Sequence, residues 1–303
     1  MKNKTIRNPL PAWTLCLLLI SATFCNAQFK ATHSTKTLKS SGYAPVNGLK
    51  MYYEIHGEGK PMVVLHGSYM NIDLNWGHLL PELVKTRKVI ALEMQGHGRT
   101  GDRKSEFSYP ALADDVAELL KYLKIDSADV LGYSLGGTVA LETAIRHPEI
   151  VNKLIIISSV FKLEGWVKAA RDLFPTITPE MFENTPLKTE YDRLAPDKSH
   201  WREFVAKNVR LDSKDFDLGA ENVRAIKSPA LFISGDNDGV DQKHLVEMYS
   251  LFGGGVMGDI AGLPKSQLAI IPGMTHVNLI MQTEHLSSLI NAFLNPPPPS
   301  KQH

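Results

Sequence analysis

The sequence predicts an α/β fold: a mostly parallel central sheet with helices on both faces, together with an inserted helical cap. Short apolar runs, typical of strands covered on both faces, alternate with longer segments whose apolar residues recur at helical spacing. One long interval, 161–227, lacks any strand pattern. Strands that alternate with helices are typical of a parallel sheet, and an interval without strands between two core strands indicates an insertion.

The composition is that of a globular protein. Of the 303 residues, 43% are hydrophobic and 21% are charged, which excludes disordered and collagen-like classes. The length suits a single α/β domain. A formal net charge of +1 provides no attraction for phosphates, so no nucleic-acid partner is expected.

Residues 1–27 are expected to be a signal peptide. Basic residues near the start precede the apolar run 12–20, which is far shorter than the roughly 20 residues that cross a bilayer. Cys25-Asn26-Ala27 supplies a small-residue cleavage pattern, so we expect cleavage after Ala27, export to the periplasm or medium, and no stable membrane insertion. A lipoprotein anchored through Cys25 is the alternative, which the bulky Phe24 disfavours.

Cleavage at that point would remove both cysteines of the chain, Cys16 and Cys25. The mature protein is therefore expected to have no disulfide, no thiolate metal site and no cysteine nucleophile. His66, His97 and Glu93 lack the spacing of metal ligands, so no metal is expected and the two histidines are interpreted as turn residues.

The strands and helices are predicted in order along the mature chain. Residues 51–55 alternate in polarity and suit an outer strand. Buried strands are expected at 62–65, 89–92, 129–131, 154–157 and 230–233, with the last strand at 268–271. Helical spacing is found at 109–123, 136–146 and 276–293. These elements make a core of residues 28–160 and 228–295, followed by a Pro-rich tail at 296–303.

The interval 161–227 is rich in aromatic residues and long enough for several helices. We predict that it forms a cap over the carboxyl edge of the sheet, and the alternative is a set of helices packed on the sheet. Trp166 and Phe174 lie eight residues apart, which would place them on one face of the first cap helix, facing the substrate.

The strongest local motif is Gly132-Tyr133-Ser134-Leu135-Gly136, between a predicted strand and a predicted helix. A nucleophile elbow needs this context, because the turn is so sharp that the residues two before and two after the serine must have almost no side chain. Ser134 is therefore the predicted nucleophile.

A serine hydroxyl needs a base, and the base needs an orienting acid. His276 follows the last predicted strand, and among the histidines it alone combines a late strand end with the order Ser, Asp, His. Two acids, Asp236 and Asp238, follow the preceding strand. Asp236 could cap the turn, whereas Asp238 lies where a loop can reach the imidazole, which favours Asp238.

With these motifs in place, residues 50–293 resemble the α/β-hydrolases. The resemblance implies that His66-Gly67-Ser68 begins the oxyanion loop, and that the backbone N–H groups of Ser68 and Leu135 bind the developing oxyanion. It also implies that the acid is the last residue of a Gly-acid-x-Asp stretch, which supports Asp238.

Departures from subfamily patterns narrow the expected reaction. Members that open epoxides use an aspartate nucleophile, whereas position 134 is serine, and residues 66–70 lack the Gly-rich patterns of iminopeptidases and carbon–carbon bond hydrolases. Hydrolysis of a carboxylic ester through an acyl-enzyme on Ser134, without a cofactor, is the expected activity. The alternatives are an amide hydrolase or perhydrolase with the same triad, and a non-catalytic ligand-binding fold, which the complete triad disfavours.

The aromatic cap indicates a small-molecule substrate that is an apolar, bulky ester or a lactone. The loop from Ser68 to Asn71 and the segment after the elbow resemble bacterial hydrolases that include macrolide-lactone esterases. Tyr69, Trp166 and Phe174 are the expected substrate-binding residues. No oligomeric state is predicted.

Overall fold

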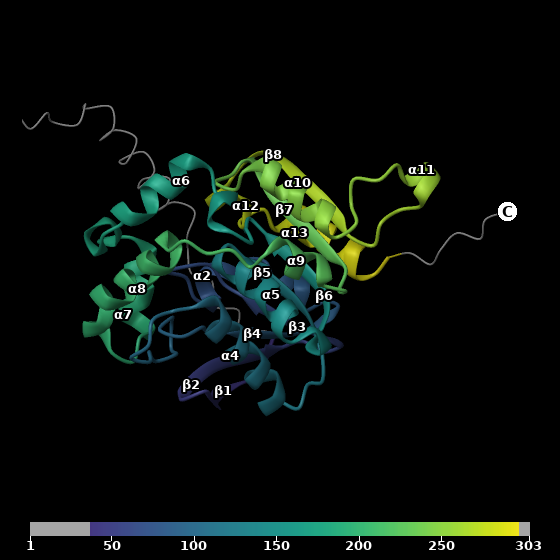
Figure 1. The fold of residues 1–303 in the computed structure, drawn as a ribbon. Coiled ribbons are helices and arrows are strands. Elements are labelled where there is room, and N and C mark those ends of the chain that lie inside the picture. The colour runs from purple at the N-terminus through teal and green to yellow at the C-terminus, as the bar shows by residue number, and fades with distance from the viewer. Residues whose placement is uncertain (1–36, 297–303) are drawn as a thin grey trace, which may run out of the picture.

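The computed structural model describes residues 37–296, so the predicted signal peptide and nearly all of the Pro-rich tail lie outside the described residues (Figure 1). An eight-stranded sheet forms the centre, in the order β1-β2-β4-β3-β5-β6-β7-β8. The strands are β1 Leu38–Val46, β2 Leu49–His56, β3 Lys60–Leu65, β4 Arg87–Leu92, β5 Ala128–Tyr133, β6 Val151–Ile157, β7 Ala230–Asn237 and β8 Gln267–Thr275.

The sheet is parallel from β4 to β8, and only β2 runs antiparallel to its neighbours β1 and β4. The predicted α/β fold with a mostly parallel sheet is thus confirmed. The sequence reasoning did not identify β1, which forms the outer edge in place of the strand predicted at 51–55. Residues 38–43 of β1 are not fully buried, so that half of the strand lacks the apolar run that marks the inner strands.

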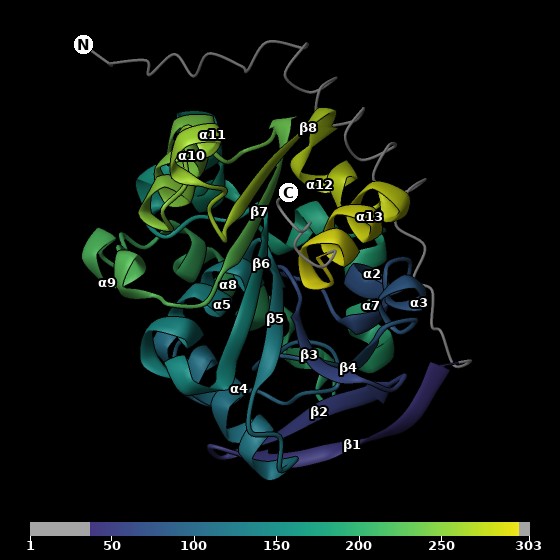
Figure 2. The ribbon, with the colours of Figure 1, turned by 90° about the vertical axis from the view of Figure 1, so that its right-hand side faces the viewer.

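Successive side chains of a strand point to opposite faces, and each inner strand therefore serves two cores. In β3, Val63 and Leu65 belong to one hydrophobic cluster, while Met62 and Val64 belong to the other. The first core lies under α4 Tyr109–Tyr122, α5 Leu135–Arg146 and α10 Gln242–Leu251. The second lies under α2 Ile72–Trp76, α3 Leu80–Leu83, α12 His276–Leu279 and α13 Thr283–Leu294. Figure 2 shows these two helical layers on opposite faces of the sheet.

The single helix predicted at 276–293 is wrong, because the chain divides it into α12 and α13. The two parts have different packing partners: α12 contacts the ends of β7 and β8, whereas α13 packs against α3. Gln282 leaves the helical region between them (φ −83°, ψ 64°), which redirects the chain from one partner to the other.

The strandless interval forms short helices that lie together beside the sheet (Figure 1). They are α6 Lys168–Leu173, α7 Pro186–Leu194 and α8 Trp201–Ser213, joined by 3₁₀ turns. Lys162 and Asp217 form an antiparallel bridge where the chain leaves the body and returns to it. The inserted segment therefore ends at this bridge, before the predicted boundary at residue 227. Residues after this bridge include α9 Ala220–Ala225, which packs against α5 and α10 because its Val223 is buried in the core.

A short helix, α11 Gly258–Ala261, projects from the body on the loop between α10 and β8 (Figure 1). Within residues 37–296, none of the helices combines the length and apolar character needed to cross a membrane.

Candidate active site

Three side chains of the predicted triad emerge where parallel strands end at the same edge of the sheet. Ser134 follows β5, Asp238 follows β7, and His276 begins α12 directly after β8. Because β5 to β8 are consecutive in the sheet, residues more than 100 positions apart in the chain become neighbours. This is the edge at which open α/β sheets bind ligands.

The turn at Ser134 has the strained geometry that a nucleophile elbow requires. Ser134 has φ 54° and ψ −120° and lies immediately before the first residue of α5. A Cβ atom on Gly132 would collide with the backbone carbonyl of Gly136, and one on Gly136 would collide with the carbonyl of Leu65. Only glycine fits at both positions, so the two glycines of the motif permit the turn that exposes the serine.

A continuous hydrogen-bond chain links the three residues. The Nε2 atom of His276 lies 3.1 Å from Oγ of Ser134, and its Nδ1 atom lies 2.8 Å from Oδ1 of Asp238. An ionised carboxylate only accepts hydrogen bonds, so Nδ1 carries the proton and Nε2 is left to accept the serine proton. The tautomer is the one that a general base needs.

Asp238 is held ionised although its side chain is fully buried. Burial by itself would raise the pKa of this carboxyl, but the charge and hydrogen bond of His276, together with donors from Ser158 and Val240, lower it to about 2. The Ser158 hydroxyl donates to Oδ2 at 2.5 Å, and the Val240 N–H donates to Oδ1 at 3.1 Å.

The competing acid, Asp236, has a different place. It lies near the end of β7, where its exposed side chain accepts a hydrogen bond from the Met274 N–H at 3.1 Å, so it joins the carboxyl ends of β7 and β8. The structure therefore brings Asp238, and not Asp236, to the imidazole.

The two residues expected to supply oxyanion donors flank Ser134. Leu135 is the first residue of α5, where the helix dipole and unpaired N–H groups favour negative charge. Ser68 follows Gly67 in the loop after β3, and the Gly67 N–H is fixed by Oδ1 of Asn75 at 2.8 Å. Ser68, Ser134 and Leu135 line the same cavity.

The histidines interpreted as turn residues are buried and hydrogen-bonded within the fold. His66 bonds the carbonyl of Gly67 through Nδ1 and accepts the Met94 N–H at Nε2. Burial lowers the pKa of His66 well below its usual range and that of His97 to about 4, so both rings are neutral. Among residues 37–296, no group of three or more His, Cys, Asp or Glu side chains is arranged to hold a metal ion.

A cavity of about 410 Å³ opens above Ser134 and is lined by residues of both the cap and the body. Tyr69, Trp166 and Phe174, the predicted substrate-binding residues, all line it. The Trp166 ring lies edge-on to the rings of Phe174 and His276, at 5.5 and 5.4 Å between centroids. The expectation that Trp166 and Phe174 share one helix is wrong: Trp166 precedes α6, and Phe174 follows it as the first residue of a 3₁₀ turn.

Sequence reasoning missed three residues that complete the site. Ser158 holds Asp238, and its position directly after β6 was the available signal. Tyr133 donates its hydroxyl to the His276 carbonyl at 2.9 Å. Asp212, at the end of α8, lines the cavity and accepts from Ser68 Oγ at 3.3 Å. No pattern in the sequence marks Asp212.

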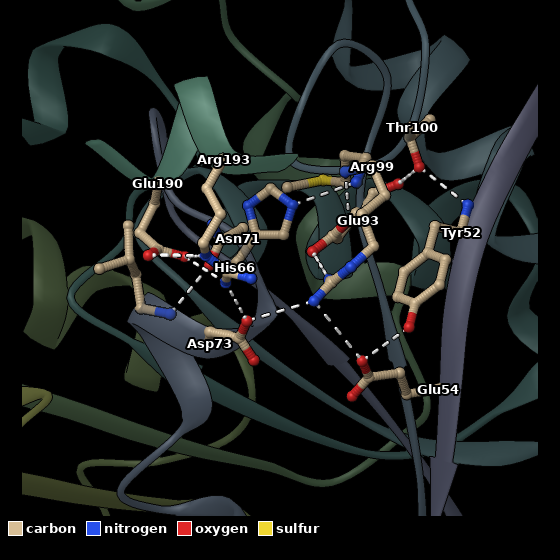
Figure 3. A network of polar contacts seen from close by, with 12 residues as sticks. Tyr52, Glu54, His66, Asn71, Asp73, Glu93, Arg99, Thr100, Glu190 and Arg193 are labelled. Carbon is tan, nitrogen blue, oxygen red and sulfur yellow. Dashed lines mark hydrogen bonds and ion pairs between the residues drawn. The ribbon is translucent and has the colours of Figure 1, made fainter. Parts of the chain in front are cut away.

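A second polar cluster lies beside the oxyanion loop, and we call it the ionic network (Figure 3). Its members are Tyr52, Glu54, Asp73, Glu93, Arg99, Glu190 and Arg193. Arg99 binds Glu93 at 2.5 Å and Asp73 at 3.2 Å, and Arg193 of the cap helix α7 binds the same Asp73 oxygen at 2.8 Å. The ionic network therefore joins the cap to the body.

Comparisons with known proteins agree with this architecture. A family model described as alpha/beta hydrolase fold matches residues 60–279. The chain is similar to 2-hydroxymuconate semialdehyde hydrolase of Pseudomonas sp. (strain CF600), with 37% identity over 116 residues that cover 37% of this chain and 41% of that protein. The chain thus spans less than half the length of this curated relative.

Solved structures resemble the chain over most of its length. A serine hydrolase involved in carbazole degradation has a TM-score of 0.67 at 22% identity, covering 85% of this chain and 99% of that one, which is a likeness of fold. A structure from a study of carboxylesterases of the thaumarchaeon Nitrososphaera gargenis has a TM-score of 0.62 at 26% identity, covering 84% and 97%. Since the family model matches more than two thirds of the residues, the chain belongs to the alpha/beta hydrolase fold family.

Proposed function

We propose that this hydrolase cleaves carboxylic esters through an acyl-enzyme on Ser134. The observation that carries the proposal is the chain from Asp238 through His276 to Ser134, which ends at the floor of a largely apolar cavity. A buried, ionised acid, a correctly oriented imidazole and a strained serine are the parts that acyl transfer to serine needs.

In the proposed reaction, Oγ of Ser134 attacks the ester carbonyl while Nε2 of His276 takes its proton. The backbone N–H groups of Ser68 and Leu135 stabilise the oxyanion of the tetrahedral intermediate. The imidazolium, held by Asp238, then protonates the leaving alcohol as the carbon–oxygen bond breaks. Water repeats the sequence against the acyl-enzyme and releases the acid. No step requires a cofactor.

The wall of the cavity supports an apolar and bulky ester, or a macrocyclic lactone, as the substrate class. Trp166, Phe174 and Phe182 present aromatic surface to a substrate bound at Ser134. Such pockets gain affinity from apolar burial and use a few polar groups for orientation.

The likeness to 2-hydroxymuconate semialdehyde hydrolase favours a second candidate, hydrolysis of a muconate-type semialdehyde. A muconate-type substrate carries a carboxylate, which a binding site normally meets with arginine or lysine. The described residues that line the cavity include neither, and they include Asp212. The electrostatics of the cavity therefore support the ester.

We also propose that the protein is exported, because residues 1–27 carry the charge and hydropathy pattern of a cleaved signal. Sequencing the N-terminus of protein recovered outside the cytoplasm should give Gln28 as the first residue. A chain that begins at a lipid-modified Cys25 would instead establish a lipoprotein.

The proposed function is tested by assaying wild type and Ser134→Ala against esters, amides, lactones and muconate-type products. We expect wild type to hydrolyse esters and to be labelled by a fluorophosphonate, and Ser134→Ala to lose both, with a rate loss of about 10⁴-fold or more. Mass spectrometry of the wild type after a slow ester should show the acyl adduct on Ser134. Ester hydrolysis that survives in a folded Ser134→Ala protein would refute the mechanism.

A further inference from the structure

Asp212 is a charged side chain in a cavity that is otherwise built for apolar contacts. It lies in the last turn of α8 and is half-buried against the cavity wall. It accepts a long hydrogen bond, 3.3 Å, from the hydroxyl of Ser68. Ser68 is one of the residues proposed to bind the oxyanion, so the carboxyl group lies close to the reacting ester.

Three features of this position disfavour an anion. The surroundings are apolar, and no lysine or arginine is among the described residues that line the cavity. The negative end of the α8 dipole adds to the cost. Burial accordingly raises the pKa of Asp212 to about 7, although the Ser68 hydrogen bond and the charge of His276 oppose the shift. A carboxylate shielded from water stays ionised most easily beside a cation, so a cationic substrate would supply the partner that the cavity lining lacks.

The rings around Asp212 are suited to an organic cation. Tyr69 and Tyr109 line the same cavity, and the negative charge of Asp212 raises the pKa of both phenols in addition to the effect of their burial. The Tyr69 hydroxyl is itself buried with no hydrogen-bond partner among the described residues. Aromatic faces combined with a carboxylate recognise alkylammonium groups, whose charge is spread over carbon and only weakly hydrated.

We propose that Asp212 and the tyrosines beside it form a cation subsite, which selects esters bearing a tertiary or quaternary ammonium group near the scissile carbonyl. This specificity rests on the proposed ester hydrolysis. Asp212 is a binding residue in this account and takes no part in bond making or breaking.

A different role for Asp212 would be to position Ser68 through their hydrogen bond. Loss of the carboxylate would then weaken the oxyanion loop for every substrate equally. A ratio of two esters that differ only in charge separates the roles, because a positioning effect cancels in that ratio.

The experiment compares butyrylcholine with 3,3-dimethylbutyl butyrate, in which carbon replaces the quaternary nitrogen. At pH 8 we expect wild type to favour the cationic ester by about tenfold in kcat/KM, because the ionised carboxylate and the cation–aromatic contacts both act on the ammonium group. Asp212→Asn should lower the ratio severalfold, because only the aromatic contacts remain. Asp215→Asn removes an equal charge from an exposed side chain three residues away and should keep the wild-type ratio.

No preference in wild type, or an unchanged preference in Asp212→Asn, would overturn the proposal. So would a loss in Asp212→Asn that is equal for both esters, which would assign the residue to positioning Ser68.

A binding measurement keeps this test separate from that of the proposed function. Calorimetry should detect saturable binding of butyrylcholine to Ser134→Ala and binding several times weaker to Ser134→Ala/Asp212→Asn. If wild type hydrolysed no ester, the proposed function would fail while this result still decided the cation subsite. Ester hydrolysis without Asp212-dependent binding would overturn the cation subsite alone.

Discussion

The polar groups of the active-site cavity and those of the ionic network differ in how completely they are partnered. In the ionic network, Arg99 contacts both Glu93 and Asp73, and the two carboxylates are almost fully buried. In the cavity, Ser134 and Asp212 present oxygen atoms to a space that a substrate can fill.

Burial of polar groups has different consequences in the two regions. The ionic network offsets part of the cost of desolvating its carboxylates with arginines from two parts of the chain, and so joins the cap to the body; burial still raises the pKa of Glu93 to about 7. The cavity leaves part of that cost uncompensated and keeps a strained backbone at Ser134. Groups held in this way are poised for a ligand, whereas fully satisfied groups stabilise a structure.

The largest difference expected within the site separates its two candidate acids. Asp238→Asn should lower kcat for an ester by about 10⁴-fold, because the imidazole then loses the acceptor that sets its tautomer. Asp236→Asn removes only an exposed charge at the ends of β7 and β8 and is the matched control, so its kcat should change far less. Steady-state kinetics on both variants checks this, and a crippled Asp236→Asn beside an active Asp238→Asn would reverse the assignment.

The next largest effect is on stability and belongs to the ionic network. Arg99→Met leaves the buried Glu93 without its main partner and leaves Asp73 with Arg193, so it should lower the free energy of unfolding by about 3–5 kcal/mol. The deficit should shrink as the pH falls, since protonation relieves the unpaired buried carboxylate.

The control for this variant is Arg202→Met, which removes an exposed pair with Glu180 that is worth no more than about 1 kcal/mol. Denaturant unfolding at pH 5 and pH 8 measures both variants. Equal stability of the two at pH 8 would contradict a stabilising role of Arg99 in the ionic network.

Two tryptophans of the cap should respond differently to truncation. Trp166→Ala enlarges the cavity, so discrimination between small and bulky esters should shift by about 1–3 kcal/mol. Trp201 packs against Tyr191 and Phe204 inside the cap, so Trp201→Ala should instead cost about 3–5 kcal/mol of stability. Ester kinetics and thermal unfolding of both variants distinguish the two roles. A Trp166→Ala protein that loses stability but keeps its discrimination between esters would show that Trp166 does not determine specificity.

The smallest expected effect is the pH dependence of the choice between the two butyrate esters. An acid ionises above its pKa, and with a pKa of about 7 the ionised fraction of Asp212 rises from roughly a tenth at pH 6 to nine tenths at pH 8. The preference for butyrylcholine should therefore increase over this range.

Three other titratable groups interact electrostatically with Asp212: His276, Tyr69 and Tyr109. Both phenols stay neutral in this pH range because their pKa values are raised. Protonation of His276, the general base, slows hydrolysis of both esters equally, so it cancels in the ratio of their kcat/KM values. A ratio that stays flat from pH 6 to pH 8 would contradict ionisation of Asp212 in this window.

The sequence by itself determined the class of fold and the order of the catalytic groups. The nucleophile elbow has local requirements: glycines at 132 and 136, a strand before Ser134 and a helix after it. A five-residue motif is therefore enough to predict it. Likewise, Asp238 and His276 follow strands directly, and the rule that parallel strands end at one edge brings them to Ser134.

Only the tertiary structure decided which groups share the cavity and which are merely near it in sequence. Asp236 and Asp238 differ in surroundings rather than in type, and Asp212 carries no motif, because its role depends on where the end of α8 lies over the sheet. The ionic network similarly joins β2, the turn after β4, and α7. Local sequence determines local conformation, whereas burial and pairing depend on contacts between distant segments, which exist only once the chain has packed.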